Sequence, residues 1–218
     1  EYAIQQGAEF CFWLNDDCSP QPGAIATLLE TCRQNPMTIA GGQSVDPDTQ
    51  HPSYGGILCE GTRITHVHAA SGSVLECDGL AGNLVCIPRS VVAAIGFPDA
   101  RECPHYYTDV VYTHRAQRQG YQLLIVGDAI AHCRNDHPPI SWMISERSPL
   151  EIWRERFLIK SPHYWKAHLA YYQEMMGWVG IWFYFYQLVI KFSMISILIV
   201  LLPKSWRIRL KHLVTHRT

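Results

Sequence analysis

Three short stretches carry side chains whose types and spacing could do chemistry. Asn15, Asp16 and Asp17 stand side by side after an apolar run, Asp109 opens a helical pattern, and His132 lies in the apolar segment A-I-A-H-C. Carboxylate oxygens are the ligands that Mg²⁺ and Mn²⁺ prefer, and a site with one or two carboxylates leaves positions open for substrate phosphates. Asp16 and Asp17 therefore predict a site for a metal-bound diphosphate.

Each of these residues also has a purely structural interpretation. An Asn-Asp-Asp sequence is common in turns, and a carboxylate such as Asp109 at a helix start stabilises the helix dipole. A histidine such as His132 in an apolar strand can be a core residue, as can His66 and His68 in T-H-V-H-A. Taken singly, the residues leave both interpretations open.

The elements around the acidic pair predict one α/β unit. The run Glu9 to Leu14 reads as a strand buried on both faces, and a helix of about three turns follows from Gly23 to Arg33 before Asn35-Pro36 stops it. Because ligands bind at the carboxyl ends of strands in α/β sheets, this order places Asp16 and Asp17 at such an end.

Further strands and short helices continue the pattern. Met37 to Ala40 predicts a strand closed by Gly41-Gly42, and residues 43–78 predict short antiparallel strands with loops. Leu84 to Ile87 predicts another strand. A short helix follows between Pro88 and Gly96, because proline favours a helix start and glycine a helix end.

The segment around Asp109 predicts a helix followed by two more strands. Thr108 is expected to cap a helix from Asp109 to Gln119, which Gly120 ends. The two strands are expected at Gln122 to Val126 and at Ala129 to Cys133, on either side of Gly127-Asp128. His132 then lies in the second strand.

With these motifs in order, the sequence resembles the family 2 glycosyltransferases, in the branch of rhamnosyl- and galactofuranosyltransferases. The resemblance rests on F-W-L-N-D-D-C-S-P at Phe12 to Pro20 and A-G-N-L-V-C-I-P-R-S-V-V-A-A-I-G-F-P-D at Ala81 to Asp99. It continues with Y-Y-T-D-V-V-Y-T-H-R-A-Q-R-Q-G-Y at Tyr106 to Tyr121 and A-I-A-H at Ala129 to His132. Four elements in the family's order cover most of the chain between Glu9 and His132.

The resemblance implies an α/β nucleotide-diphospho-sugar transferase fold, the type A glycosyltransferase fold, with a C-terminal helical extension. It also implies roles for individual residues: Asp109 as catalytic base, Asp17, Asp16 and His132 as ligands of Mg²⁺ or Mn²⁺, and Asn15, Asp16, Gly82 and Asn83 as donor-binding residues.

The chain also departs from the family pattern. Asn15 stands where the family's first motif usually begins with Asp, Thr108 stands where a Glu usually precedes the base, and the Arg-Asn pair expected after the catalytic domain is not evident near Tyr164-Trp165-Lys166. The family's first strands, which grip the nucleotide base, would lie before Glu1. The chain is therefore expected to be an N-terminally truncated transferase that binds donor weakly or not at all on its own.

Charge divides the chain into an acidic part and a basic end. The net charge of −1 combines 19 acids and 12 Lys or Arg up to Glu174 with six Lys or Arg and no acid from Met175 onward. Such asymmetry favours a membrane surface as partner of the C-terminus. The composition, 48% hydrophobic with 17% charged residues, excludes a disordered or fibrous protein.

The C-terminal part is predicted to be helical. Ser148-Pro149-Leu150-Glu151 is a capping box, and Ser161-Pro162 begins a helix that runs to Gly177. Trp178 to Leu202 is long enough to cross a bilayer. Small or polar residues recur on one face of this pattern, however, at positions 173, 177, 180, 184, 187 and 191.

An amphipathic helix in the membrane interface is therefore preferred over a simple span, with a re-entrant hairpin or a buried helix as alternatives. Eight cysteines without a C-x-x-C pair favour reduced thiols. Both the thiols and the basic end suit the cytoplasmic face of a membrane, with peripheral, monotopic or shortly inserted attachment.

The leading hypothesis is an inverting, metal-dependent transferase that moves a sugar from a nucleotide-diphosphate donor to a glycan or lipid-linked acceptor. The alternatives are a polyprenyl-phosphate glycosyltransferase, a non-catalytic membrane-bound scaffold and, more remotely, a metal-dependent phosphohydrolase. A nucleic-acid partner is not expected, and a homo-oligomer stays open. The expected parts are a partial catalytic domain at 1–140, a helical extension at 141–177, and a membrane-associating helix with a basic tail at 178–218.

Overall fold

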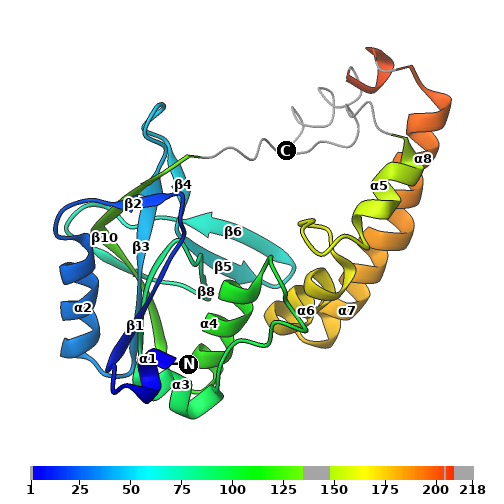
Figure 1. Ribbon diagram of the computed structural model, residues 1–218. Helices are drawn as coiled ribbons and strands as arrows, with labels where there is room; N and C mark the ends of the chain where they lie inside the picture. The colour runs from blue at the N-terminus through cyan, green and yellow to red at the C-terminus, as the bar shows by residue number, and fades with distance from the viewer. Residues whose placement is uncertain (1, 135–147, 204, 209–218) are drawn as a thin grey trace.

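The computed structural model describes residues 2–134, 148–203 and 205–208. It has an α/β body built around a mixed sheet, and a helical arm at its C-terminal end (Figure 1). The expected α/β class with a C-terminal helical extension is confirmed. The expected boundary between residues 140 and 141 lies outside the described residues.

The central sheet has seven strands, of which five follow one another in the order β1-β9-β3-β10-β2, while β4 pairs with β3 and β7 with β10. Only the pair β3 and β10 is parallel among these described pairings. These strands are β1 Phe10–Leu14, β2 Cys18–Pro20, β3 Thr38–Val45, β4 Pro52–Tyr54, β7 Val74–Glu76, β9 Leu84–Pro88 and β10 Gln122–Cys133.

A second sheet of three short antiparallel strands, in the order β6-β5-β8, lies beside the first. Its strands are β5 Gly56–Glu60, β6 Arg63–Val67 and β8 Gly79–Leu80. The short antiparallel strands expected between residues 43 and 78 are therefore confirmed.

Helices cover both faces of the central sheet. On one face, Leu28 and Cys32 of α2 (Ala24–Gln34) are buried against Ala40 of β3 and Cys86 of β9. On the other face, α3 (Arg89–Ile95) and α4 (Thr108–Arg118) contribute Val91, Tyr112 and Ala116 to a cluster around Ile39 and Leu123. Neighbouring residues of β3 point to opposite layers, as a strand requires. The core thus fixes the strand ends on which the candidate site depends.

The edge strand β1 differs from its prediction. Among the described strands it pairs with β9 alone, and four of its five residues are half-buried, so it is not covered on both faces. The apolar run predicted the strand correctly. It could not show that β1 is an edge strand, with a described neighbour on one side only.

Strand β3 also differs, because it continues through Gly41 and Gly42 instead of ending there. A Cβ atom on Gly41 would lie 2.6 Å from a methyl carbon of Leu80, and one on Gly42 would lie 2.6 Å from the carbonyl oxygen of Ala129. The two glycines therefore allow close packing in the middle of a strand, where the sequence suggested a stop.

The two strands expected after Gly120 form a single strand, β10, with a bulge between Ile125 and Ile130. The bulge is packed tightly, because a Cβ atom on Gly127 would lie 2.0 Å from the carbonyl oxygen of Ala70. Asp128 accepts hydrogen bonds from the Ser71 hydroxyl and the Gly72 backbone N–H. Gly127-Asp128 therefore marks a bulge and not a turn.

The helical arm contains α5 (Pro149–Glu155), α6 (Trp165–Met176) and a continuous helix formed by α7 (Trp178–Phe185), a π-helical turn (Tyr186–Lys191) and α8 (Phe192–Leu201). The predicted capping box at Ser148 and Glu151 is confirmed. Helix α6 begins at Trp165, three residues after Pro162. A short helix, α1 (Tyr2–Gln5), precedes β1.

Candidate functional site

A cleft of about 660 Å³ lies where β1, the segment before β9 and the start of α4 meet. It brings together six of the seven residues that the sequence singled out for chemistry, from three separate stretches of the chain. These residues are Asn15, Asp16, Asp17, Gly82, Asn83 and Asp109.

Asp109 is held by backbone hydrogen bonds at the start of α4. Its Oδ2 atom accepts the backbone N–H of Gly82 at 2.6 Å, and its Oδ1 atom accepts the N–H of Val110 at 2.9 Å. A Cβ atom on Gly82 would lie 3.0 Å from the Cβ of Asp109, so a side chain there would crowd the carboxyl group. Glycine at position 82 therefore allows the backbone to approach and orient this carboxyl group.

The surroundings of Asp109 favour its protonated form. Burial raises the pKa of the Asp109 carboxyl above its ordinary value, and the hydrogen bonds from Gly82 and Val110 offset this rise only in part. A raised pKa makes a carboxylate a stronger base, provided that the pH is high enough to ionise it.

The N-cap of α4 is Tyr107 and not Thr108, so the predicted cap is wrong by one residue. The Thr108 hydroxyl instead donates to the carbonyl oxygen of Cys103. Tyr107 has a φ angle of 68°, in the left-handed region that residues other than glycine rarely adopt. Its strained backbone begins the helix that carries Asp109.

Aromatic packing against the arm holds Tyr107 in place. Its ring stacks on His168 and on Tyr171 of α6 at centroid distances of 5.6 Å and 4.5 Å, and its hydroxyl donates to the carbonyl oxygen of Pro162 at 3.0 Å. Burial lowers the pKa of His168 to about 3, so this ring is neutral at physiological pH. The helical arm thus supports the wall of the cleft next to Asp109.

The carboxylates of Asp16 and Asp17 lie exposed in the turn after β1. Asp17 Oδ1 accepts a weak hydrogen bond from the thiol of Cys133 at 3.9 Å, and the amide of buried Asn83 donates to the same sulfur at 3.3 Å. Burial raises the pKa of Cys133 to about 12, so the thiol stays protonated. Cys133 therefore connects the acidic turn to Asn83, a link that the sequence did not predict.

His132 is not among the residues that line the cleft. It neighbours Cys133 on β10, and because side chains alternate along a strand, the two point to opposite faces. Its Nε2 atom lies 3.1 Å from the side-chain amide nitrogen of Gln21. Within residues 2–134, 148–203 and 205–208, no group of three His, Cys, Asp or Glu side chains is arranged to hold a metal. The metal role of His132 stays a prediction.

The cleft also has aromatic residues that the sequence patterns did not indicate. Phe12 and Trp13 of β1, Tyr54 at the end of β4, and the pair Tyr106-Tyr107 line the cleft beside the polar groups. The signal that could have indicated the pair is its position directly before Asp109. Such rings offer flat apolar surface of the kind that binding pockets present to the apolar faces of ligands.

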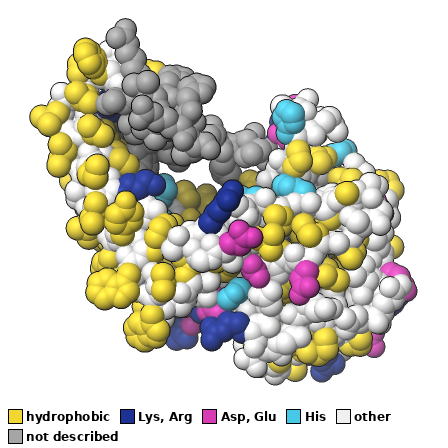
Figure 2. Space-filling view, turned by 180° about the vertical axis from the view of Figure 1, so that it is seen from behind, with side chains coloured by type: hydrophobic (Ala, Val, Ile, Leu, Met, Phe, Trp, Pro, Cys, Tyr) yellow, Lys and Arg dark blue, Asp and Glu magenta, His cyan; other side chains and the backbone are white. Residues whose placement is uncertain are grey.

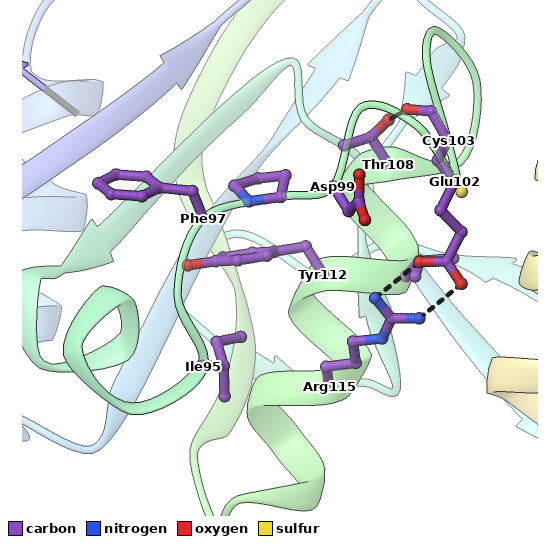
Figure 3. A pocket seen from close by; sticks show the side chains of 10 residues that line it. Ile95, Phe97, Asp99, Glu102, Cys103, Thr108, Tyr112 and Arg115 are labelled. Carbon is purple, nitrogen blue, oxygen red and sulfur yellow. Dashed lines mark hydrogen bonds and ion pairs between the residues drawn. The ribbon is translucent and has the colours of Figure 1, made fainter.

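A smaller cleft of about 210 Å³ lies at another part of α4, between Phe97, Tyr112 and Arg115 (Figure 3). Its charged groups are already engaged in ion pairs. Arg115 contacts Glu102 at 2.8 Å and also Glu174 of α6 at 2.9 Å, while Asp99 pairs with Arg101. The larger cleft is therefore the candidate site, because its carboxylates are not engaged in ion pairs among the described residues.

No protein-family model matches the sequence, and no curated protein matches it. Among solved structures, the chain is similar to GalNAc-T7, crystallised with UDP, GalNAc and Mn²⁺, at 12% identity and a TM-score of 0.48. That match covers 61% of this chain and 29% of the GalNAc-T7 chain. The chain is also similar to A197 from STIV, at 11% identity and a TM-score of 0.39, over 64% of this chain and 74% of that one.

Proposed function

We propose that the protein is an inverting, metal-dependent glycosyltransferase that moves a sugar from a nucleotide-diphosphate donor to a hydroxyl group of a glycan or lipid-linked acceptor. The observation that carries this proposal is the cleft itself, in which an exposed pair of carboxylates and an oriented, partly buried carboxyl group share one cavity. The sequence resemblance supports the rhamnosyl- and galactofuranosyltransferase branch as its nearest type.

Asp109 acts as the base in this proposal. Its Oδ atoms are fixed by Gly82 and Val110, so the carboxylate can take the proton of an acceptor hydroxyl without first reorienting. As that proton moves to Asp109, the acceptor oxygen forms a bond to the anomeric carbon of the donor sugar. The bond from that carbon to the diphosphate breaks with inversion, and the leaving diphosphate keeps the electron pair.

Asp16 and Asp17 would hold Mg²⁺ or Mn²⁺ in the same proposal. Two exposed carboxylates fit a cation that keeps several waters and takes its remaining ligands from substrate phosphates. Such an ion supplies positive charge that stabilises a departing diphosphate. Asn15 and Asn83 add amide groups at this end of the cleft, where they can hydrogen-bond to the donor.

A cytoplasmic location remains part of the proposal. All eight cysteines are free thiols, which suits a reducing compartment. A polyprenyl-phosphate acceptor would use the same base and the same carboxylate pair, so it is an alternative acceptor for this chemistry and not a different mechanism.

Metal-dependent nucleotide binding tests the proposal. The protein, with whatever residues its reading frame encodes before Glu1, is titrated with uridine, guanosine and thymidine diphosphates by calorimetry, with Mn²⁺ and with EDTA. We expect one nucleotide to bind only with Mn²⁺, and Asp17→Ala to weaken that binding about tenfold or more, because it removes a charged metal ligand. Asp48→Ala is the matched control, since Asp48 is an exposed carboxylate paired with Arg134 outside the cleft.

Two results would contradict the proposed site. One is binding that persists in EDTA and is indifferent to Asp17→Ala. The other is a loss of affinity of the same size in Asp48→Ala. Either would show that the carboxylate pair after β1 does not hold a metal-bound diphosphate.

A further inference from the structure

We propose that the long helix of the arm docks in the plane of a lipid bilayer, through its outer apolar face, and does not cross the bilayer. This inference does not depend on the transferase chemistry. The helix Trp178–Leu201 is long and apolar enough to span a membrane by length and composition. Only 11% of its most apolar stretch is buried, so most of this stretch is exposed. At 1.5 Å per residue its 24 residues extend about 36 Å.

The exposed large hydrophobic residues of this helix form one apolar face. Trp178 is 81% exposed and Trp182 is 76% exposed, although large aromatic side chains are usually mostly covered. Figure 2 shows hydrophobic side chains gathered along the outer edge of the arm. The face continues along the helix with Val179, Phe185, Tyr186, Val189, Ile190, Met194, Ile197, Val200 and Leu201.

The opposite face of the same helix is packed against the rest of the arm. Gly180 and Tyr184 are buried, and a Cβ atom on Gly180 would lie 1.8 Å from the backbone oxygen of Tyr172 in α6. Farther along, the Phe192 ring is fully buried and packs edge-to-face on Trp153 of α5 at 4.7 Å. Within the part of the chain that the structure describes, the helix therefore has one covered face and one bare face along most of its length.

This packing argues against a simple crossing. The guanidinium of Arg156 lies 5.0 Å from the centre of the Phe192 ring, and the exposed charges of Glu151 and Arg154 are on the adjoining helix α5. If the helix spanned the membrane, these charged groups beside its middle would enter the hydrocarbon region, where burying each charge is strongly unfavourable. Docking in the plane of the bilayer keeps α5 and α6 on the water side and places only the bare face among lipids.

The charge of the chain favours an anionic bilayer over a second protein copy as the occupant. From Met175 onward the sequence has six Lys or Arg and no acid, so this end complements anionic lipid headgroups and would repel an identical end. Trp178 and Trp182 at one end of the helix, and exposed Trp206 beyond the other, are residues that favour the membrane interface.

Flotation with vesicles of phosphatidylcholine and phosphatidylglycerol tests the docking face. The full chain is expected to float with the vesicles, and Val189→Glu to lower its partition coefficient roughly tenfold or more, since a charge replaces an apolar side chain in lipid. Val74→Glu on β7 is the matched control, because Val74 is 56% exposed and Val189 is 55% exposed. Equal partitioning of the two variants, or a Val189→Glu effect confined to self-association in sedimentation, would overturn the proposal.

Lysine labelling on the vesicles separates docking from crossing. Lys191 lies exposed near the middle of the helix, and Lys166 of α6 is an exposed reference. A water-soluble amine reagent and mass spectrometry give the ratio of Lys191 labelling to Lys166 labelling. In-plane docking predicts that this ratio is the same on vesicles as in solution. Selective protection of Lys191 on vesicles would instead place it inside the bilayer and overturn the in-plane arrangement.

Discussion

At the scale of single residues, the proposed chemistry depends on how Asp109 is held. Gly82 lets a backbone N–H reach the carboxyl group, and burial makes that group harder to ionise than an ordinary aspartate. The same two features that position Asp109 therefore also set the pH range in which it could act as a base.

The first prediction concerns pH. Because the pKa of Asp109 is raised, the base is protonated and inactive over a wider acidic range than for an ordinary aspartate. We expect kcat/KM for transfer to fall, as the pH is lowered, at a pH above the usual aspartate range. Nucleotide binding measured over the same pH range is the control for donor ionisation. An acid limb at the ordinary aspartate pKa would contradict the environment described for Asp109.

The second prediction concerns Gly82. In Gly82→Ala the new methyl group would lie 3.0 Å from the Cβ and 3.2 Å from the Oδ2 of Asp109, so the carboxyl group must shift. We expect transfer to fall about tenfold or more, with a loss of about 1–3 kcal/mol in the free energy of unfolding. Gly79→Ala is the control variant, because its new methyl group would lie 2.8 Å from a side-chain carbon of Val110 and not against Asp109. A loss of transfer that only matches the loss in Gly79→Ala would argue against specific crowding of Asp109.

At the scale of elements, both ends of helix α4 contact helix α6 of the arm. Tyr107 is stacked on α6 near the start of α4, and Glu174 accepts hydrogen bonds from Arg115 and Arg118 near its end. Although burial opposes ionisation, the contacts with His114 and Arg115 lower the pKa of Glu174 to about 2. The arm therefore contributes to the stability of the body.

The third prediction concerns this link. Glu174→Gln is expected to lower the free energy of unfolding at neutral pH by about 1–3 kcal/mol, measured by urea denaturation. Because the folded-state pKa is depressed, the contribution of Glu174 is fully present above its ordinary pKa of 4.5 and is lost as the pH falls towards about 2. Glu30→Gln, on the exposed face of α2, should have little effect. A constant difference between wild type and Glu174→Gln down to about pH 2 would contradict the ion-pair explanation.

The sequence predicted local features more reliably than contacts between distant segments. The helix between Gly23 and Asn35 was predictable from periodicity and its proline stop, and the capping box at Ser148 was predictable from its motif. The course of β3 through Gly41 and Gly42 was not, because its cause is the approach of Leu80 and of β10. The grouping of Asp17 with Asp109 was expected only from the family resemblance.

Two site details needed the structure for the same reason. Tyr107 takes its left-handed conformation in contact with α6, about 60 residues away along the chain, and no local pattern indicates that partner. His132 lies one residue from Cys133, yet only Cys133 contacts Asp17, since the strand register decides which side chain faces the turn.

At the scale of the whole molecule, the acidic body and the basic apolar arm have separate roles in the proposed account. The body carries the cleft, and the arm both supports α4 and presents one bare face (Figure 2). If that face rests on a bilayer, the site is held near a membrane, which suits a lipid-linked acceptor. Vesicle binding and transfer are then separable properties of one chain.

The fourth prediction follows from this separation. Val189→Glu is expected to leave transfer to a water-soluble acceptor unchanged within about twofold, because Val189 is exposed on the arm and lies outside the cleft. Transfer to an acceptor embedded in vesicles should fall in proportion to the loss of flotation. An equal loss with both acceptors would contradict separate roles for the body and the arm.

The central claim is that Asp109 is the base of a sugar transfer in the cleft, and Asp109→Asn tests it most directly. This change keeps the size of the side chain and one of the two oxygens that accept backbone N–H groups, but the amide group that replaces the other oxygen cannot take a proton. With the nucleotide-sugar selected by the binding titration, the account predicts Mn²⁺-dependent nucleotide affinity within about threefold of wild type. Transfer should fall by roughly 10²-fold to 10⁴-fold. Transfer that survives Asp109→Asn at the wild-type rate would contradict the account.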